Sequence, residues 1–207
     1  MPQGDVSDWL ERLGSSDPTP GGGAAAALAA SAGAALVEMV VNLTKGKKAY
    51  AEHESHVVPI GEQAATLRER AWRLAADDEA AFGAVMAAYG LPKQTDDDRA
   101  ARAAAIERAT AAAARPPLQV AAVAAEVIEL AASLPGRSNP NVLSDVGVAA
   151  SLAVSSLESA AINVEVNLGG LTEPGARDEL RKELDGYLTA GELGRRVVAD
   201  VRARLTS

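Results

Sequence analysis

The sequence predicts an all-α fold, in the form of a single-domain bundle of long helices. No run shows the sustained two-residue alternation of a half-buried strand, whereas apolar residues recur at helical spacing over long stretches. Apolar residues make up 48% of the 207 residues but aromatic residues only 3%, so the core must be built from Ala, Val and Leu. Such a core suits closely packed helices better than a β-sandwich. Residues 1–207 contain no internal repeat and no long linker, so one domain is expected.

Seven helices are expected, at residues 5–13, 24–41, 59–89, 96–115, 120–134, 144–168 and 176–205. The first is short and amphipathic, with Trp9 and Leu13 on its apolar side. The second is rich in Ala, Gly and Ser, which predicts a buried helix close to its neighbours. The third carries apolar residues at helical spacing until Gly90, Leu91 and Pro92 end it.

Acidic residues and prolines mark the boundaries of the later helices. Asp96–Asp98 supply a cap and first-turn acids for the fourth helix. Pro116 and Pro117 kink or break the chain before the fifth. Ser144 or Asp145 is expected to cap the sixth, and the seventh carries apolar residues inward and charges outward.

Composition excludes several classes of function. A net charge of −8 argues against nucleic acid or an anionic membrane surface as the main partner. The absence of cysteine excludes disulfides, thiol nucleophiles and Cys-ligated metals. His53 and His56 lie in a polar segment without the His-Glu-x-x-His arrangement, so they are expected to be solvated and no metal site is expected.

The N-terminal region predicts a cytoplasmic protein. Residues 1–5 do not lead from a basic region into an apolar run, so they do not resemble a signal peptide. Residues 21–41 are long enough to span a membrane, but Ala, Gly and Ser contribute little to insertion and Glu38 lies within the run. A buried helix of a soluble protein is the better interpretation. Its small residues, such as Ala27, Ser31 and Ala35, permit tight helix contacts within the fold or across a dimer.

A glycine-rich elbow, Pro18-Thr19-Pro20-Gly21-Gly22-Gly23, leads into the second helix. The free N–H groups at the start of a helix can bind an anion, such as a carboxylate or phosphate of a ligand. The alternative is that the glycines merely let two backbones pack closely. No P-loop or dinucleotide fingerprint is present, because the glycines follow prolines and no Gly-Lys-Ser/Thr sequence occurs.

Asp77, Asp78 and Glu79 form an acidic cluster within an apolar part of the third helix. Successive helical residues are about 100° apart, so one of the three must point nearer to the core than the others. Desolvation there would favour a proton at neutral pH and produce a general acid. The alternative is an ordinary solvated helix face.

Two groups of polar residues are further candidates. Asn139, Asn141, Ser144 and Asp145 lie on a turn that enters an apolar helix, where turn formation and capping explain them as well as ligand contact does. Asn163 and Asn167 lie one turn apart on an apolar helix. A buried Asn needs partners for two donors and an acceptor, which either a bound heterocycle or another helix could supply.

Taken together, five blocks resemble the cyclodeaminase/cyclohydrolase family, which contains the cyclodeaminase part of formiminotransferase-cyclodeaminase and stand-alone bacterial methenyltetrahydrofolate cyclohydrolases. The blocks occur in the family's order and span nearly the whole chain. They are Pro18-Thr19-Pro20-Gly21-Gly22-Gly23; Met39-Val40-Val41-Asn42-Leu43-Thr44 with Lys47-Lys48; Asp78 with Phe82 and Leu91-Pro92-Lys93; Ser144-Asp145-Val146-Gly147-Val148-Ala149; and Asn163-Val164-Glu165-Val166-Asn167-Leu168.

The resemblance implies a helical fold that forms a homodimer and a folate site built from helices and the glycine-rich loop. The family acts on one-carbon units that bridge N5 and N10 of tetrahydrofolate, and its proposed catalytic aspartate corresponds to Asp78. The resemblance favours a methenyltetrahydrofolate cyclohydrolase, since no formiminotransferase domain is present on this sequence. A formiminotetrahydrofolate cyclodeaminase that uses the same site is the alternative. A non-catalytic folate-binding or scaffold protein is an alternative of another class.

The same resemblance suggests roles for the other candidates. Lys47 and Lys48 are expected to attract the folate glutamate tail, and Gly21–Gly23 to receive that tail or the benzoyl amide. Asn163 and Asn167 are expected to contact the pterin or to order Asp78. Residues of the 139–145 segment, namely Asn139, Ser144 and Asp145, are assigned to substrate binding, the last two at the amine-bearing edge of the pterin. No cofactor beyond the tetrahydrofolate substrate is expected.

Two positions depart from the family pattern. Ser138 stands where a glycine commonly precedes the loop asparagine, so the loop is expected to sit differently. Ala76 stands where the family often has a second acid, which puts a role for a second carboxylate in doubt.

Overall fold

The computed structural model describes residues 6–206, and within this range the fold is helical without strands. The all-α prediction is therefore confirmed. The elements are α1 (Val6–Leu13), α2 (Gly22–Asn42), η1 (Lys48–His53), α3 (Glu54–Tyr89), α4 (Asp96–Ala113), α5 (Arg115–Ala132), η2 (Pro140–Val142), α6 (Leu143–Gly169), α7 (Pro174–Leu188) and α8 (Ala190–Leu205). Asp5, which was expected in the first helix, lies outside the described residues.

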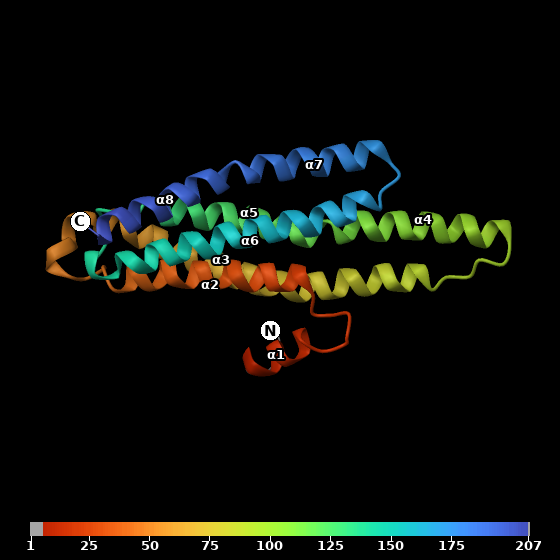
Figure 1. The fold of residues 1–207 in the computed structure, drawn as a ribbon, viewed down its shortest axis with the longest axis horizontal. Helices are drawn as coiled ribbons and strands as arrows, with labels where there is room; N and C mark the ends of the chain where they lie inside the picture. Colours follow the sequence, from red (N-terminus) through yellow and green to blue (C-terminus); the bar gives the residue numbers. More distant parts are fainter. Residues whose placement is uncertain (1–5, 207) are drawn as a thin grey trace.

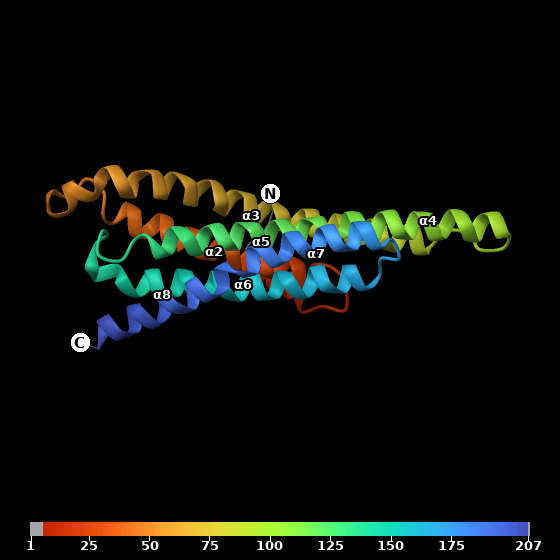
Figure 2. The same cartoon turned by 90° about the horizontal axis from the view of Figure 1, so that it is seen from above.

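The long helices lie side by side in an elongated bundle (Figures 1 and 2). Helix α2 packs against α3 and α6, α5 packs against α6, and α7 and α8 cover α5 and α6. One continuous apolar core joins residues from Trp9 to Val201. Its fully buried members are mostly Ala and Val, with a few larger side chains such as Ile128 and Leu157. The small side chains let the helix axes approach closely.

Helices α3 and α4 form a hairpin that projects past the other helices at one end of the bundle (Figures 1 and 2). Helix α3 has 36 residues and is therefore about 54 Å long. Gly90 ends it, as the sequence predicted. The far part of the hairpin packs on fewer neighbours, so several apolar side chains there are exposed, among them Met86 and Leu91.

Several predicted boundaries were wrong. The helix expected from Pro59 begins at Glu54, because Val57 and Ile60 bury their side chains and offset the one backbone hydrogen bond that Pro59 removes. The helix expected over 176–205 is two helices, separated at Thr189. The Thr189 hydroxyl donates to the Gly186 carbonyl at 2.8 Å and so competes with the helical hydrogen bonds.

Two caps and one further helix start also differ from expectation. The cap of α4 is Thr95, whose side chain accepts from the Asp98 N–H while the Asp98 carboxylate accepts from the Thr95 N–H. The N-cap of α6 is Val142, without a side-chain cap, so Ser144 and Asp145 lie inside the first turn. The chain does break before the two prolines, but α5 starts at Arg115 rather than at 120, since prolines are tolerated in a first helical turn.

Two segments, Gly22–Asn42 and Pro140–Gly169, are long and apolar enough to cross a membrane by length and composition alone. About half of each is buried inside the bundle, at 50% and 56% of the most apolar window. The core helices of soluble proteins have the same character. The bundle thus accounts for the apolar composition of α2.

Candidate active site

A groove of about 390 Å³ lies where the N-terminus of α2 meets α3, the C-terminal end of α4 and the C-terminal half of α6. Its walls are apolar and polar in similar measure, and a few polar side chains converge on it. The lining residues are Pro18, Thr19, Gly21, Gly22, Gly23, Asp78, Phe82, Val85, Tyr89, Thr110, Ala113, Asn163, Val166, Asn167 and Gly170. The groove thus brings together the glycine elbow, the acidic cluster and the asparagine pair.

Asp78 is the acid of the cluster that turns towards α2, since Asp77 is exposed and the half-buried Glu79 pairs with Arg12. Its carboxylate lies against the first turn of α2 and accepts a hydrogen bond from the Ala24 N–H. Gly23 makes this contact possible, because a Cβ at this position would overlap the carboxylate. The glycine thus permits a close contact, but with a side chain and not a second backbone, and the anion at the helix N-terminus is the protein's own carboxylate and not that of a ligand.

Burial raises the pKa of the Asp78 carboxyl above its ordinary value. The hydrogen bond from the Ala24 N–H lowers this pKa, and the neighbouring charge of Glu79 raises it. Burial has the largest effect, so the pKa stays raised. A carboxyl with a raised pKa gives up its proton less readily than an ordinary aspartate, and in the groove it can serve as a general acid or base.

Glu79 is tied to the N-terminal helix. The guanidinium of Arg12 lies 2.8 Å from the Glu79 carboxylate. This ion pair joins α1 to α3 next to the catalytic candidate. It fixes the segment between Leu13 and Gly21, whose Pro18 and Thr19 form part of the groove wall.

Asn163 and Asn167 make backbone contacts as well as lining the groove. Asn167 donates both of its amide N–H groups, to the carbonyls of Ala113 (3.3 Å) and Asn163 (2.9 Å). The Ala113 carbonyl needs this donor because Pro117, four residues later, has no N–H. Asn167 can therefore offer a ligand only its amide oxygen.

Asn163 lies closest to the start of α2. It donates to the Ser159 carbonyl at 2.8 Å, which uses one of its two amide hydrogens. A Cβ at Gly22 would lie 3.4 Å from the amide nitrogen and oxygen of Asn163, so the elbow and this side chain are in contact. The remaining N–H and the oxygen can pair with the edge of a heterocycle.

The remaining predicted site residues lie at the opposite end of the bundle (Figure 1). Lys47 precedes η1, Lys48 begins it, and Ser144 and Asp145 begin α6. The 21 residues of α2 separate this end from the groove by about 30 Å. Within one chain these residues cannot contact a ligand held at Asp78.

At that far end, Asn139 joins the loop before α6 to the segment that contains Leu43 and Tyr50. Its amide oxygen accepts from the Tyr50 hydroxyl at 3.1 Å and its amide nitrogen donates to the Leu43 carbonyl at 3.2 Å. Ser138 is buried beside it and donates to the Leu134 carbonyl at 3.0 Å, so it fits the place of the family's glycine. Ala76 is exposed and does not line the groove.

The two histidines are half-buried rather than fully solvated, and His56 lies 3.3 Å from the Ser133 carbonyl. Within residues 6–206, no three Asp, Glu or His side chains gather as metal ligands would.

Sequence reasoning missed Thr19, Thr110, Val85 and Tyr89 as lining residues. Thr110 stands alone as a polar residue in an Ala-rich stretch, which is a weak signal. Tyr89 lies eleven residues after Asp78, three turns along the same helix face. That spacing could have indicated it.

A sequence model described as "Formiminotransferase-cyclodeaminase" matches residues 5–186. The chain belongs to the formiminotransferase-cyclodeaminase family. It is 47% identical over 201 residues to a methenyltetrahydrofolate cyclohydrolase of Methylorubrum extorquens, with 97% of each chain covered. It is 28% identical over 184 residues to the rat formimidoyltransferase-cyclodeaminase, where 87% of this chain matches 33% of the longer rat protein.

A crystal structure of formiminotetrahydrofolate cyclodeaminase from Thermotoga maritima has the same fold. The TM-score is 0.87 at 26% identity, with 99% of this chain and 98% of the other covered. The family resemblance and the cyclodeaminase-like fold are thus confirmed.

Gly23→Ala is expected to lower kcat of this family member roughly 100-fold, because the new methyl group displaces the Asp78 carboxylate by about an ångström. Gly83→Ala is the matched control on α3, since a Cβ there meets nothing within 4 Å. Steady-state kinetics and thermal melts of both variants check this. Full activity in Gly23→Ala would contradict the placement of Asp78.

Asp78→Asn is expected to stabilise the folded protein above pH 7. The raised pKa means that the contribution of Asp78 to stability is complete below its unfolded pKa of about 3.9 and falls as the pH rises through the folded-state pKa. Asn cannot ionise and still accepts from the Ala24 N–H. Thermal melts should therefore give equal Tm values near pH 4 and a higher Tm for the variant at pH 8. A lower Tm at pH 8 would contradict the burial effect.

Proposed function

We propose that this chain is a methenyltetrahydrofolate cyclohydrolase, which converts 5,10-methenyltetrahydrofolate and water to 10-formyltetrahydrofolate. The observation that carries the proposal is the half-buried Asp78, seated on the first turn of α2 in a groove that also holds two asparagine amides. The 47% identity to a cyclohydrolase over nearly the whole chain favours this reaction over cyclodeamination. The relatives named for cyclodeamination are 26–28% identical.

In the proposed mechanism, Asp78 moves one proton twice. As a carboxylate it takes a proton from the water that attacks the bridging carbon, which gives a tetrahedral adduct. It then delivers this proton to N5 as the bond between carbon and N5 breaks. The hydroxyl of the adduct loses its proton to solvent and becomes the formyl oxygen on N10.

The charge of the substrate suits this cycle. The methenyl bridge is a cationic amidinium, so a bound substrate favours the ionised form of Asp78 and lowers its pKa relative to the free protein. Once water has added, the positive charge is gone and the buried carboxyl again holds a proton more readily. The bound substrate thus favours ionised Asp78 before water adds, and the neutral adduct favours the protonated Asp78 that then delivers its proton to N5.

The folate derivative is the one ligand that this mechanism requires. We propose that the residues of the groove act without a metal or redox cofactor, because addition of water and proton transfer need neither. We also place the protein in the cytoplasm, without a nucleic acid or membrane partner. The net charge of −8 is consistent with this.

The decisive assay follows the absorbance of 5,10-methenyltetrahydrofolate with wild-type protein and Asp78→Asn, against the uncatalysed rate in the same buffer. Wild type is expected to accelerate the loss, and Asp78→Asn to lower kcat by about 10²- to 10⁴-fold. A parallel assay measures ammonia release from 5-formiminotetrahydrofolate. Ammonia release without methenyl hydrolysis would identify a cyclodeaminase, and no turnover of either substrate would contradict an enzymatic role.

The second part of the proposal is a homodimer. Helices α2 and α6 each keep an exposed or half-exposed stripe of uncharged residues at helical spacing. Val148, Ile162 and Val166 on α6 are 48%, 62% and 71% exposed. Unpartnered apolar side chains of this kind favour a contact with a second copy. The residues of the two stripes are Ala25, Ala29, Ala32, Leu36 and Met39 on α2 with its C-cap Leu43, and Val148, Ser151, Ser155, Ile162 and Val166 on α6.

A twofold axis that crosses α2 near its middle would set each groove beside the far end of the other subunit. Lys47 of the partner subunit and its neighbours could then serve the groove, although they lie about 30 Å from it within one chain. We therefore propose that Lys47, Lys48, Asn139, Ser144 and Asp145 act across the dimer.

Coexpression of Asp78→Asn with Lys47→Ala/Lys48→Ala tests this arrangement. Each variant alone is expected to be poorly active. A random mixture contains about half heterodimers with one intact site each, which gives about a quarter of wild-type activity. Activity no higher than that of the two parents, or a monomeric mass by light scattering, would contradict the shared site.

A further inference from the structure

The groove runs along one face of α3, and its two ends differ in exposure. Asp78, Phe82, Val85 and Tyr89 follow one another at helical spacing and all line the groove. The row is less exposed at its start than at its end: Asp78 and Val85 are half-buried, Phe82 is 37% exposed and Tyr89 is 52% exposed. The groove is therefore closed at the glycine elbow and opens at Tyr89, about 16 Å from Asp78 along the helix.

The two ends of the groove differ in chemistry. The closed end presents backbone and the amide of Asn163, which suit a heterocycle with donors and acceptors on its edge. The open end presents two aromatic rings, Phe82 and Tyr89, separated by two turns of helix. A flat aromatic ring that leaves the reacting centre along this row would contact both.

Arg102 of α4 holds Tyr89 in place at the open end. Its guanidinium carbon lies 5.4 Å from the centre of the Tyr89 ring. Its Nε and Nη2 donate to the Tyr89 carbonyl at 3.2 and 3.1 Å. These bonds use one hydrogen on each atom, so three of the five N–H groups, on Nη1 and Nη2, are left for another acceptor.

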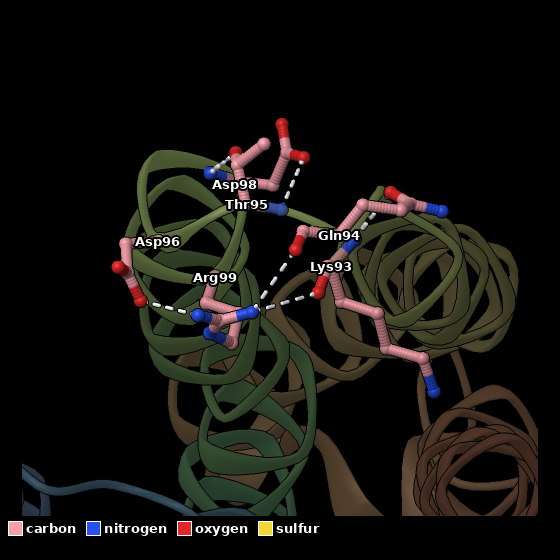
Figure 3. Close-up of polar contacts among 6 residues, drawn as sticks. All are labelled: Lys93, Gln94, Thr95, Asp96, Asp98 and Arg99. Carbon is pink, nitrogen blue, oxygen red and sulfur yellow. Dashed lines mark hydrogen bonds and ion pairs between the residues drawn. The ribbon is translucent and has the colours of Figure 1, made fainter.

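The cation of Arg102 lacks a carboxylate partner within the described part of the chain, unlike its neighbour Arg99. Figure 3 shows how the hairpin tip uses Arg99, which pairs with Asp96 and donates to the carbonyls of Lys93 and Gln94. The capping box of Thr95 and Asp98 fixes the same turn. Arg99 is thus used by the turn, whereas Arg102, one turn further along α4, keeps spare donors beside Tyr89 of the groove wall.

We propose that the substrate lies in the groove with its bridging carbon at Asp78, its benzoyl ring along Phe82 and Tyr89, and a glutamate carboxylate on Arg102. This inference rests on the proposed folate function and adds the orientation of the substrate. It assigns the first glutamate to the hairpin of the same chain, and leaves Lys47 and Lys48 to other contacts. Arg102 is then a specificity residue for the glutamate, in addition to its contact with the C-terminal carbonyl of α3.

The test compares two substrates, 5,10-methenyltetrahydrofolate and its analogue in which a neutral alkylamide replaces the glutamate. In wild type, loss of the glutamate is expected to lower kcat/KM about tenfold through KM, as for one charge-assisted hydrogen bond at a partly exposed site. Arg102→Gln should turn over both substrates at the rate that wild type shows with the neutral analogue. Arg108→Gln, which removes an exposed charge from the same helix, is the control and should keep the tenfold preference.

Other outcomes overturn the inference. If Arg102→Gln slows both substrates equally, Arg102 only caps α3. If Lys47→Gln/Lys48→Gln instead abolishes the preference, the glutamate is bound by these lysines and not by Arg102. Arg102→Lys keeps the charge if Arg102→Gln does not fold, and is expected to retain part of the preference. Wild type that turns over neither substrate would overturn the proposed function itself. Turnover with a preference that Arg102→Gln leaves intact would overturn the orientation alone.

Discussion

The contact between the Asp78 carboxylate and the first turn of α2 is the interaction on which the site depends. It joins residues 55 positions apart in the sequence, and it requires that position 23 has no side chain. The free N–H groups of the helix stabilise the carboxylate, while burial disfavours its charge. Burial has the larger effect, so the pKa of Asp78 is raised while its ionised form still has a hydrogen-bond donor.

The rest of the fold serves to hold this contact. Small side chains let α2 lie close to α3 and α6, so that the start of α2 is enclosed by both helices. The Arg12–Glu79 ion pair fixes α1 and the loop before the elbow. Asn167 replaces the hydrogen bond that Pro117 cannot make, and so joins α6 to the break between α4 and α5.

The sequence predicted the helices and the central part of the site because both follow from local patterns. Helical spacing, the Gly90 stop and the break before Pro116 indicated most elements, and the ordered family blocks indicated Asp78, the elbow and the two asparagines. Boundaries failed where tertiary contacts overrode local signals, as at Pro59, or where a hydroxyl interrupted a helix, as at Thr189. Local patterns did not predict which candidates lie together in space. Lys47 follows the elbow and Asp145 precedes Asn163 in the sequence, yet both lie at the other end of the bundle, the length of the 21-residue α2 away from the groove.

The pH dependence of methenyltetrahydrofolate hydrolysis tests the role of Asp78 most directly. After subtraction of the uncatalysed rate, kcat/KM reports the free enzyme and kcat reports the substrate complex. The account predicts an acid limb in both profiles, with an apparent pKa above the ordinary aspartate value in kcat/KM and a lower one in kcat, and neither limb in Asp78→Asn. An acid limb that persists unchanged in Asp78→Asn would show that another group carries the proton.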